Sequence, residues 1–390
     1  MNLTLPPGSP NVDEFVSAST LKITGIEAIP VRVPIRENLA IRGKAGYHAV
    51  SPFLIVRVQT DGGLTGLGEV SCTPRWSGED STTAAHFIRT IFEPLLTGKD
   101  ALDIGAASHA MRHALFGHAF TKAAIEMALW DLLGKAAGLP VYRLLGGKRR
   151  DFVPTKWSIS GVAPDKAAAI ANWAAEKGFR TMKVKVGIDR DQDVERVKAV
   201  REAVGPDVRL GVDANGAWKP RMAIDMVHRL AEYDIYFVEQ PVPAGDPSWL
   251  ADVRNAVDVP VIADESLYTA QDALSLIREE ACDVFSVYVG KSGGISAGAH
   301  LAAVADAAGL SCTLGSNLEM GIGSAAMLHL AIATGGFVEG QFPCDIIGPL
   351  FYEDELLREP LDIRGGEARV PDGPGLGVEL DPEKLERYAV

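Results

Sequence analysis

The chain has few cysteines, no long apolar run and a deficit of positive charge over its 390 residues. Its four cysteines lie far apart and form no Cys-x-x-Cys pair, which argues against a disulfide scaffold or a cysteine metal site. No apolar run approaches the roughly 18 residues that a membrane span needs. The N-terminal residues lack the basic start and apolar segment of a signal peptide. We therefore expect a cytoplasmic protein whose thiols are reduced.

Acidic residues outnumber basic ones by 51 to 38, so the formal net charge is −13 at pH 7. Nucleic acids and anionic membranes favour proteins of the opposite sign, so neither is an expected partner. Hydrophobic residues make up 47% of the chain and charged residues 23%, which excludes a disordered or fibrous class. The length implies either two domains or one barrel of about 250 residues with additions.

The composition and the spacing of apolar residues change twice in the first half of the chain. Residues 1–21 are rich in Pro, Ser and Asn and are expected to be a loose N-terminal extension. Strand-like alternation follows, with the hairpin signal TDGG between two apolar segments, and residues 83–145 then take a helical period. Strands followed by helices indicate an α+β domain over residues 22–150.

After Gly146-Gly147, short apolar strands alternate with amphipathic helices. The eight candidate strands are VPTKWSIS, TMKVKVG, VRLGVDAN, IYFVEQP, VPVIADES, DVFSVYVG, LSCTLGS and GFVEGQF. This rhythm predicts an α/β barrel over residues 151–348, with the last strand-helix unit incomplete. Residues 349–390 have strand and turn character and are expected to return to the first domain.

Three carboxylates end consecutive candidate strands: Asp213, Glu239 and Asp264. Their separations of 26 residues (213 to 239) and 25 residues (239 to 264) each match one strand-helix unit. Because active sites of such barrels lie at the carboxyl ends of the strands, we expect these acids to converge and bind a hard divalent cation. Mg²⁺ is the first candidate and Mn²⁺ also fits, whereas oxygen-only ligands argue against Zn²⁺.

Lys183 and Lys185 lie two apart on the second candidate strand, so they share a face opposite the apolar residues. That face is the barrel interior. A lysine beside another cation and a metal has a depressed pKa and is a candidate general base, although both lysines could instead be structural ion pairs. On the sixth strand, Tyr288 lies near the same rim, where it either relays a proton or only fills the barrel mouth.

These residues resemble motifs of the enolase superfamily, on the muconate-lactonizing-enzyme side of the mandelate racemase and muconate cycloisomerase group. The matching segments are AAIEMALWDLLGKAAGLPVYRLLGG, TMKVKVG, VDANGAW, VEQPVP, ADES, KSGGI and GSNLEMGIGSAA. The resemblance extends over about residues 22–380.

The resemblance implies a modified (β/α)₇β TIM barrel with an α+β capping domain that residues 349–390 complete. It implies Mg²⁺ on the three carboxylates and a substrate carboxylate whose α-proton is removed to give a metal-stabilised enolate. Lys185 carries over as the base and Lys183 as its electrostatic neighbour. Asn215 is a candidate near the metal, and Glu319 lies where such proteins often place a polar site residue.

One position departs from the family pattern. A second catalytic lysine is normal five residues before the first Gly of the KSGG pair, and here that residue is Tyr288, while Lys291 occupies the later position. The change favours one-base chemistry, as in a cycloisomerase or a syn-dehydratase, that is, an isomerase or a lyase. Two alternatives stay open: a two-base racemase or epimerase of an amino-acid or dipeptide derivative using Lys185 and Tyr288, and a non-catalytic barrel that binds a metal carboxylate.

Substrate choice is expected to depend on the loops ENLAIRGKAGYHAV and TPRWSGED and on the end of the eighth strand. Tyr47 and Trp76 are candidate contacts from the loops, Asp345 is a candidate for a substrate ammonium, and Lys291 is a further candidate near the site. The expected ligand is a small organic or amino acid with a carboxylate. We also expect a homo-oligomer.

Overall fold

The computed structural model describes residues 20–39, 41–43, 46–337 and 341–390, and only the backbone of residues 41–43 and 46–48. Nearly all of the predicted extension, and the side chain of Tyr47, therefore lie outside the described part. Leu21 is held in place, since its carbonyl accepts a hydrogen bond from the Ala101 N–H at 2.8 Å. Within these ranges no helix is both long and apolar enough to cross a membrane.

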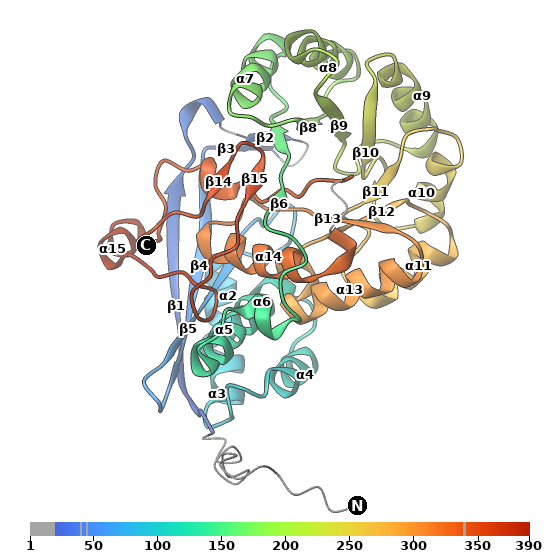
Figure 1. The fold of residues 1–390 in the computed structure, drawn as a ribbon. Coiled ribbons are helices and arrows are strands. Elements are labelled where there is room, and N and C mark those ends of the chain that lie inside the picture. Colours follow the sequence, from blue (N-terminus) through green and yellow to red (C-terminus); the bar gives the residue numbers. More distant parts are fainter. Residues whose placement is uncertain (1–19, 40, 44–45, 338–340) are drawn as a thin grey trace, which may run out of the picture.

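The first domain is an antiparallel sheet covered by helices (Figure 1). Its strands, in the order β1-β4-β5, are β1 (Ile23–Pro34), β4 (Val50–Thr60) and β5 (Thr65–Ser71), and β2 (Ile41–Gly43) pairs with β3 (Gly46–His48). The helices are α2 (Ser81–Phe87), α3 (Glu93–Leu96), α4 (Ile104–Ala114), α5 (Ala119–Ala137) and α6 (Val141–Leu144). The predicted TDGG hairpin is confirmed, because Gln59 pairs with Thr65 across the turn.

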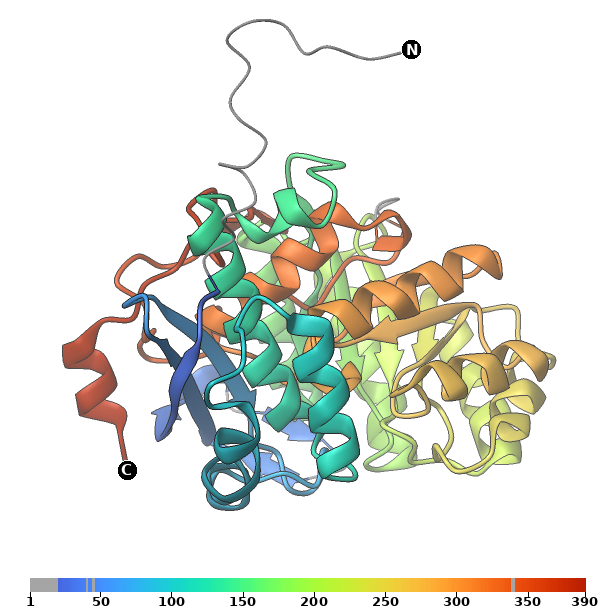
Figure 2. The same cartoon turned by 90° about the horizontal axis from the view of Figure 1, so that it is seen from below.

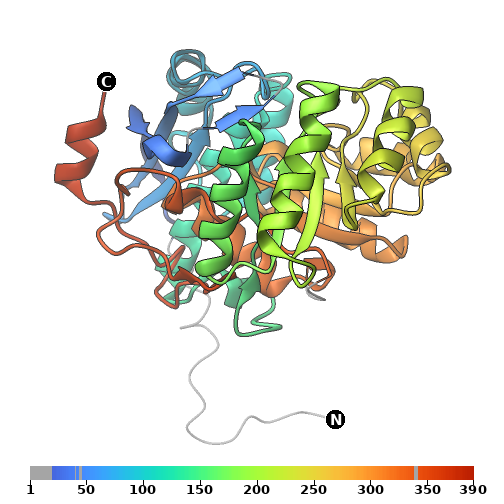
Figure 3. The ribbon, with the colours of Figure 1, turned by 90° about the horizontal axis from the view of Figure 1, so that it is seen from above.

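The second domain is a curled parallel sheet of seven strands in the order β13-β12-β11-β10-β9-β8-β7. They are β7 (Trp157–Ile159), β8 (Thr181–Lys185), β9 (Arg209–Asp213), β10 (Ile235–Glu239), β11 (Val261–Ala263), β12 (Val284–Val287) and β13 (Ser311–Leu314). The helices are α7 (Pro164–Glu176), α8 (Arg190–Val204), α9 (Pro220–Ala231), α10 (Pro247–Arg254), α11 (Ala270–Arg278), α12 (Val289–Ser292), α13 (Ile295–Ala307) and α14 (Gly321–Ala333). Figures 2 and 3 show the blue strands of the cap on one side of the molecule and the yellow-green barrel units on the other. The predicted class, a TIM-type barrel with an antiparallel capping domain, is confirmed.

The segment that connects the two sides of the parallel sheet lies later in the chain than the predicted eighth strand. Within the described part of GFVEGQF there is no strand, and residues 335–337 form a short 3-10 helix instead, because the Gly335-Gly336 pair favours a turn. The next segment bonds to the edge strand β13 and to β6, which leads into the other edge strand, β7. Cys344 N–H donates to Pro154 O at 2.8 Å, and Asp345 N–H donates to Leu314 O at 2.7 Å.

The C-terminal segment returns to both domains. The strands β14 (Ile363–Arg364) and β15 (Glu367–Ala368) form a small antiparallel sheet with β6 (Val153–Pro154), which leads into the barrel. The last helix, α15 (Pro382–Tyr388), lies beside β1, where Val390 N–H donates to Pro30 O at 3.0 Å (Figure 1). We keep the division into residues 22–150 with 349–390, and 151–348, as a proposal.

Candidate active site

The predicted polar residues come together at the carboxyl ends of the barrel strands. Lys183 and Lys185 lie on β8, Asp213 ends β9 and Glu239 ends β10. Asp264 lies just after β11, Tyr288 lies just after β12, and Asp345 lies in the segment that bonds to β13 and β6. The strand register alone aligns Lys185 with Asp213 and Asp213 with Glu239. The equal spacing noted in the sequence therefore corresponds to one rim of the barrel.

Lys185 lies at the open edge of this cluster. Its side chain is 17% exposed, against 4% for Lys183. Its Nζ donates to Asp213 Oδ2 at 2.6 Å and to Asn215 Oδ1 at 2.9 Å. Burial alone would raise the pKa of Asp213, but the positive charges of Lys185 and Lys183 lower it below the usual value. Asp213 is thus an ionised partner that holds Lys185 in place.

Lys183 is the buried member of the pair. Its Nζ donates to Glu239 Oε1 and to Asp345 Oδ2, both at 2.8 Å, and lies 3.5 Å from Asp213 Oδ2. Burial alone would lower the pKa of Lys183, but the three carboxylates together raise it well above the ordinary value. The surrounding acids outweigh the neighbouring cation at Lys183, and the depressed lysine pKa expected beside a bound metal stays a prediction.

Glu239 has a spare acceptor. Its Oε2 is buried without a hydrogen-bond partner. Burial raises the pKa of Glu239 to about 8; the Lys183 charge opposes this shift, and the charges of Asp213 and Asp264 add to it. An unpartnered carboxylate oxygen among like charges suits a divalent cation. As placed, however, no three Asp, Glu, His or Cys side chains in the described ranges are grouped closely enough to hold one.

Asp264 is held by Lys291 and Tyr288. The Lys291 Nζ donates to Asp264 O at 2.6 Å, Asp264 Oδ1 at 2.7 Å and Ser286 O at 3.0 Å, which uses all three of its N–H donors. The Tyr288 hydroxyl donates to Asp264 Oδ2 at 3.1 Å. Burial and nearby carboxylates raise the pKa of Tyr288 well above its usual value. Lys291 is therefore a counter-ion, and Tyr288 directs its proton to Asp264.

Trp76 brings the first domain into the site, on the predicted loop TPRWSGED. Its ring stacks on Tyr288 with centroids 5.3 Å apart, and its indole N–H donates to Glu265 Oε1 at 3.1 Å. Asn215 Nδ2 donates to the same oxygen at 2.9 Å. We did not predict Glu265 as a site residue, because its place next to Asp264 does not show which way its side chain points.

Two predicted contacts have partners within the protein. Glu319 accepts hydrogen bonds from the Ser316 hydroxyl and from Asn317 N–H in its own loop. Asp345 Oδ2 lies 2.8 Å from Lys183 Nζ and 3.2 Å from Lys156 Nζ. Asp345 is thus a counter-ion for two buried lysines, and its predicted contact with a substrate ammonium stays a prediction that only Oδ1 is free to make.

A buried ion pair on α8 supports the loop that follows Lys185. The Arg196 guanidinium donates to Asp193 Oδ1 at 2.6 Å and to the Lys185 carbonyl at 3.1 Å. Asp193 Oδ2 accepts from the N–H groups of Gly187 and Ile188. Both charged side chains are buried, because they satisfy the backbone of the loop.

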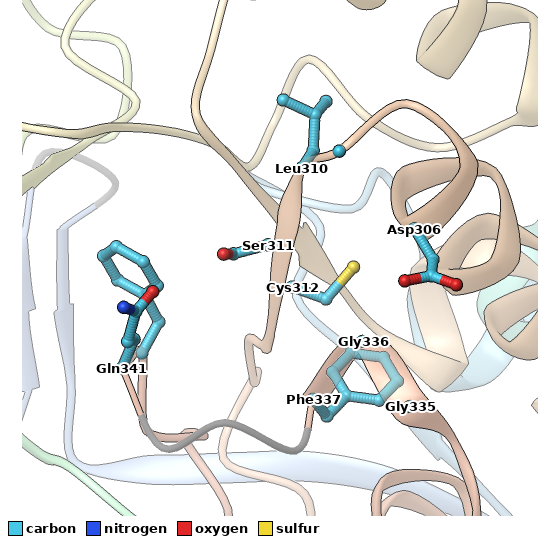
Figure 4. Close-up of a pocket in the computed structure, with 10 residues that line it drawn as sticks. Asp306, Leu310, Ser311, Cys312, Gly335, Gly336, Phe337 and Gln341 are labelled. Atoms are coloured by element: carbon cyan, nitrogen blue, oxygen red, sulfur yellow. The ribbon is translucent and has the colours of Figure 1, made fainter.

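A pocket of about 200 Å³ lies at the other end of the barrel (Figure 4). It is lined by residues that include Asp306, Ser311, Cys312 and Phe337. Ser311 is the first residue of β13, whereas the acids lie at the last residues of their strands. This pocket is therefore separate from the candidate site.

A parallel barrel that carries lysines and acids at its strand ends, beside an antiparallel cap, defines the chain as a capped TIM-barrel enzyme. More specifically, it belongs to the mandelate racemase/muconate lactonizing enzyme family of the enolase superfamily: residues 27–146 match the N-terminal domain of that family, and residues 165–384 match the enolase C-terminal domain-like model.

Its relatives include enzymes of two reaction types. The chain is 33% identical to the L-Ala-D/L-Glu epimerase of Bacillus subtilis, over 92% of this chain and 97% of the relative. The structure of the muconate lactonizing enzyme of Pseudomonas fluorescens with muconolactone matches with a TM-score of 0.91 and 31% identity, covering 95% of this chain and all of the other. A dipeptide epimerase of Cytophaga hutchinsonii, complexed with Mg and D-Ala-L-Val, matches with a TM-score of 0.88 and 32% identity over 94% and 98%. The chain is accordingly an isomerase of the enolase superfamily, a family whose members generally bind a divalent metal ion.

Proposed function

We propose that this isomerase moves the proton on the carbon next to a carboxylate, with Lys185 as its single acid–base residue, in the manner of a cycloisomerase. One observation carries the proposal. The position across the site from Lys185 holds Tyr288, whose hydroxyl donates to Asp264. At the carboxyl ends of the described barrel strands, Lys185 combines a partly exposed amino group with partners that orient it.

We propose Asp213, Glu239 and Asp264 as the ligands of Mg²⁺, with Mn²⁺ as a second choice. Their oxygen donors and the unpartnered Glu239 Oε2 support this assignment. So does the dipeptide epimerase structure, which contains Mg. When bound, the ion supplies a Lewis acid that holds the substrate carboxylate and stabilises the negative charge that develops on it.

In the proposed mechanism, the neutral amine of Lys185 takes the α-proton while Asp213 and Asn215 orient its Nζ. The buried ammonium of Lys183 adds a fixed positive charge in a water-excluded site. In cycloisomerisation that starts from a lactone, the ring carbon–oxygen bond then breaks, its electron pair leaves with the second carboxylate, and the proton stays on Lys185; in the reverse direction Lys185 gives its proton to the same face. Syn-elimination also needs only this one residue, because Lys185 passes the proton to the hydroxyl that leaves as water.

A two-base epimerase is the second candidate, favoured by the 33% identity to the L-Ala-D/L-Glu epimerase. It requires an acid–base group on the face opposite Lys185, and Tyr288 is the residue there. The donation of its hydroxyl to Asp264 and its raised pKa oppose that role. A metal-binding barrel without activity is the third alternative.

Incubation in D₂O with Mg²⁺ separates these alternatives. We suggest cis,cis-muconate, muconolactone, L-Ala-L-Glu and an N-acyl amino acid as the panel, read by proton NMR and chiral chromatography. One-base chemistry predicts deuterium in one configuration only, whereas label in both configurations indicates the epimerase. Product that has lost water identifies a lyase, and no exchange with any compound contradicts both enzymatic proposals. The homo-oligomer and the small-carboxylate substrate stay predictions, which light scattering and the same panel test.

A further inference from the structure

We infer that Glu265 is a positioning residue that couples the cap loop carrying Trp76 to the base Lys185, acting through Asn215. The role of Lys185 in this inference rests on the proposed function, whereas the coupling of the cap loop to Asn215 through Glu265 does not depend on it. Glu265 follows directly after Asp264 in the chain, yet its contacts reach both domains.

The first link runs from Glu265 to Lys185. Asn215 Nδ2 donates to Glu265 Oε1 at 2.9 Å, and Asn215 Oδ1 accepts from Lys185 Nζ at 2.9 Å. A primary amide has one acceptor end and one donor end, so the acid on one side determines which end faces the lysine. Without Glu265 the amide is free to turn and present its NH₂ group to an ammonium, which is a repulsive contact. Glu265 thus fixes the orientation in which Asn215 holds the base.

The second link runs from Glu265 to the cap. The Trp76 indole N–H donates to the same oxygen, Oε1, at 3.1 Å across 189 residues of sequence. The Trp76 ring covers Tyr288, with an angle of 20° between the ring planes. The far end of this loop is fixed within the cap, because Glu79 accepts hydrogen bonds from the first N–H groups of α5. Glu265 therefore bonds the middle of the loop to the barrel.

Burial of the Glu265 carboxylate costs free energy of folding. Glu265 Oε2 is buried without a hydrogen-bond partner, and both links use Oε1 alone. Burying an unpaired carboxylate oxygen is unfavourable, so packing alone does not account for a polar acceptor at this position. A glutamine keeps an acceptor oxygen for both donors, whereas a leucine of similar size removes both links. Comparison of these two variants isolates the links from the bulk of the side chain.

The test uses the full-length protein with Glu265→Gln, Glu265→Leu and the control Glu279→Leu, whose side chain is exposed. Hydrogen–deuterium exchange of peptides covering residues 73–80 needs no substrate. We expect about tenfold faster exchange in Glu265→Leu, and near wild-type exchange in Glu265→Gln and Glu279→Leu. If Glu265→Leu does not fold, Trp76→Phe replaces it, because that variant keeps an aromatic ring while it removes the N–H donor together with part of the indole.

With a substrate from the D₂O panel, Glu265→Leu is expected to lose about a hundredfold in kcat with KM changed less than threefold, and Glu265→Gln to recover most of it. Wild-type exchange rates at residues 73–80 in a folded Glu265→Leu variant, or an unchanged kcat, would overturn the inference. A wild-type protein that turns over nothing contradicts the proposed function instead, and the loop exchange still tests the coupling.

Discussion

Two lysines on one face of one strand have different surroundings and hence different roles. Lys183 lies among three carboxylates that keep it charged, whereas Lys185 lies at the edge with one acid and one amide. Their shared face could be predicted from the two-residue period. The third acid around Lys183, Asp345, could not be predicted as its partner, because that contact depends on where the last segment of the barrel enters the sheet.

Tyr288→Phe tests the role of the residue opposite the base. The variant removes only the hydroxyl that donates to Asp264, so we expect a loss of kcat/KM of no more than about a hundredfold, since one hydrogen bond to a charged group contributes about 1.5–3 kcal/mol. Steady-state assays of wild type and variant on the same substrate measure it. A loss as large as that of Lys185→Met would show that Tyr288 transfers a proton.

The packing of strand β5 against helix α5 depends on a glycine. A Cβ added at Gly68 would lie 1.8 Å from the Ala124 carbonyl oxygen, so the strand or the helix must shift. We expect Gly68→Ala to lower the free energy of unfolding by about 3 kcal/mol, the upper part of the range for overpacking. Urea denaturation measures this. Gly105→Ala is the control, since nothing lies within 4 Å of its added Cβ, and similar losses in both variants would contradict the packing argument.

The start of α14 is held by a buried acid of the cap. Glu69 Oε1 accepts from Met320 N–H at 2.7 Å and Oε2 from Gly323 N–H at 3.0 Å. Burial raises the pKa of Glu69 to about 8; these backbone hydrogen bonds oppose the shift, and the charges of Glu355 and Glu319 add to it. The folded state therefore keeps a proton that the unfolded chain has lost above its ordinary pKa of 4.5.

Because the folded state holds this extra proton, we expect the free energy of unfolding to fall as pH rises from about 4.5 to about 8. The fall is at most about 1.4 kcal/mol per pH unit for this one proton. Glu69→Gln cannot ionise, so its stability should depend less on pH, although it is less stable overall because the amide NH₂ meets an N–H donor. Urea denaturation at several pH values checks both. An equal slope in wild type and Glu69→Gln would contradict the assignment.

Most of the barrel strands and the hairpin of the cap could be predicted from the sequence. Seven barrel strands and the cap hairpin follow from apolar period and turn residues. The closing segment was misplaced because GFVEGQF has a strand-like composition, while the buried Cys344 and Asp345 lie in a stretch with no alternation. The ion pair of Asp193 and Arg196 was missed, because sequence pattern does not reveal which charged residue satisfies a loop backbone.

For the whole molecule, the rim acids predict how a metal changes stability. A cation that binds only the folded state stabilises it by about 2.7 kcal/mol at a hundred times its dissociation constant. We therefore expect Mg²⁺ to raise the melting temperature of the wild type and to leave that of Glu239→Gln nearly unchanged. Calorimetry with and without EDTA measures this, and Glu279→Gln is the control. An equal rise in wild type and Glu239→Gln would remove Glu239 from the ligand set.

The net charge of −13 does not point to the site, whereas the placement of a few acids does. Asp213, Glu239 and Asp264 could be found from the repeat of the barrel, since each ends one unit. Glu265 could not, because its contacts with Asn215 and Trp76 join residues far apart in the chain. Long-range contacts of this kind depend on how the cap sits against the barrel.

The central claim, that Lys185 alone moves the α-proton on one face of a small carboxylate, is tested most directly by NMR in D₂O. Wild type with Mg²⁺ should place deuterium in a single configuration, and Tyr288→Phe should do the same at a reduced rate. Lys185→Met should lose at least about a thousandfold in exchange rate. Label in both configurations, or exchange that survives in Lys185→Met, would contradict the account.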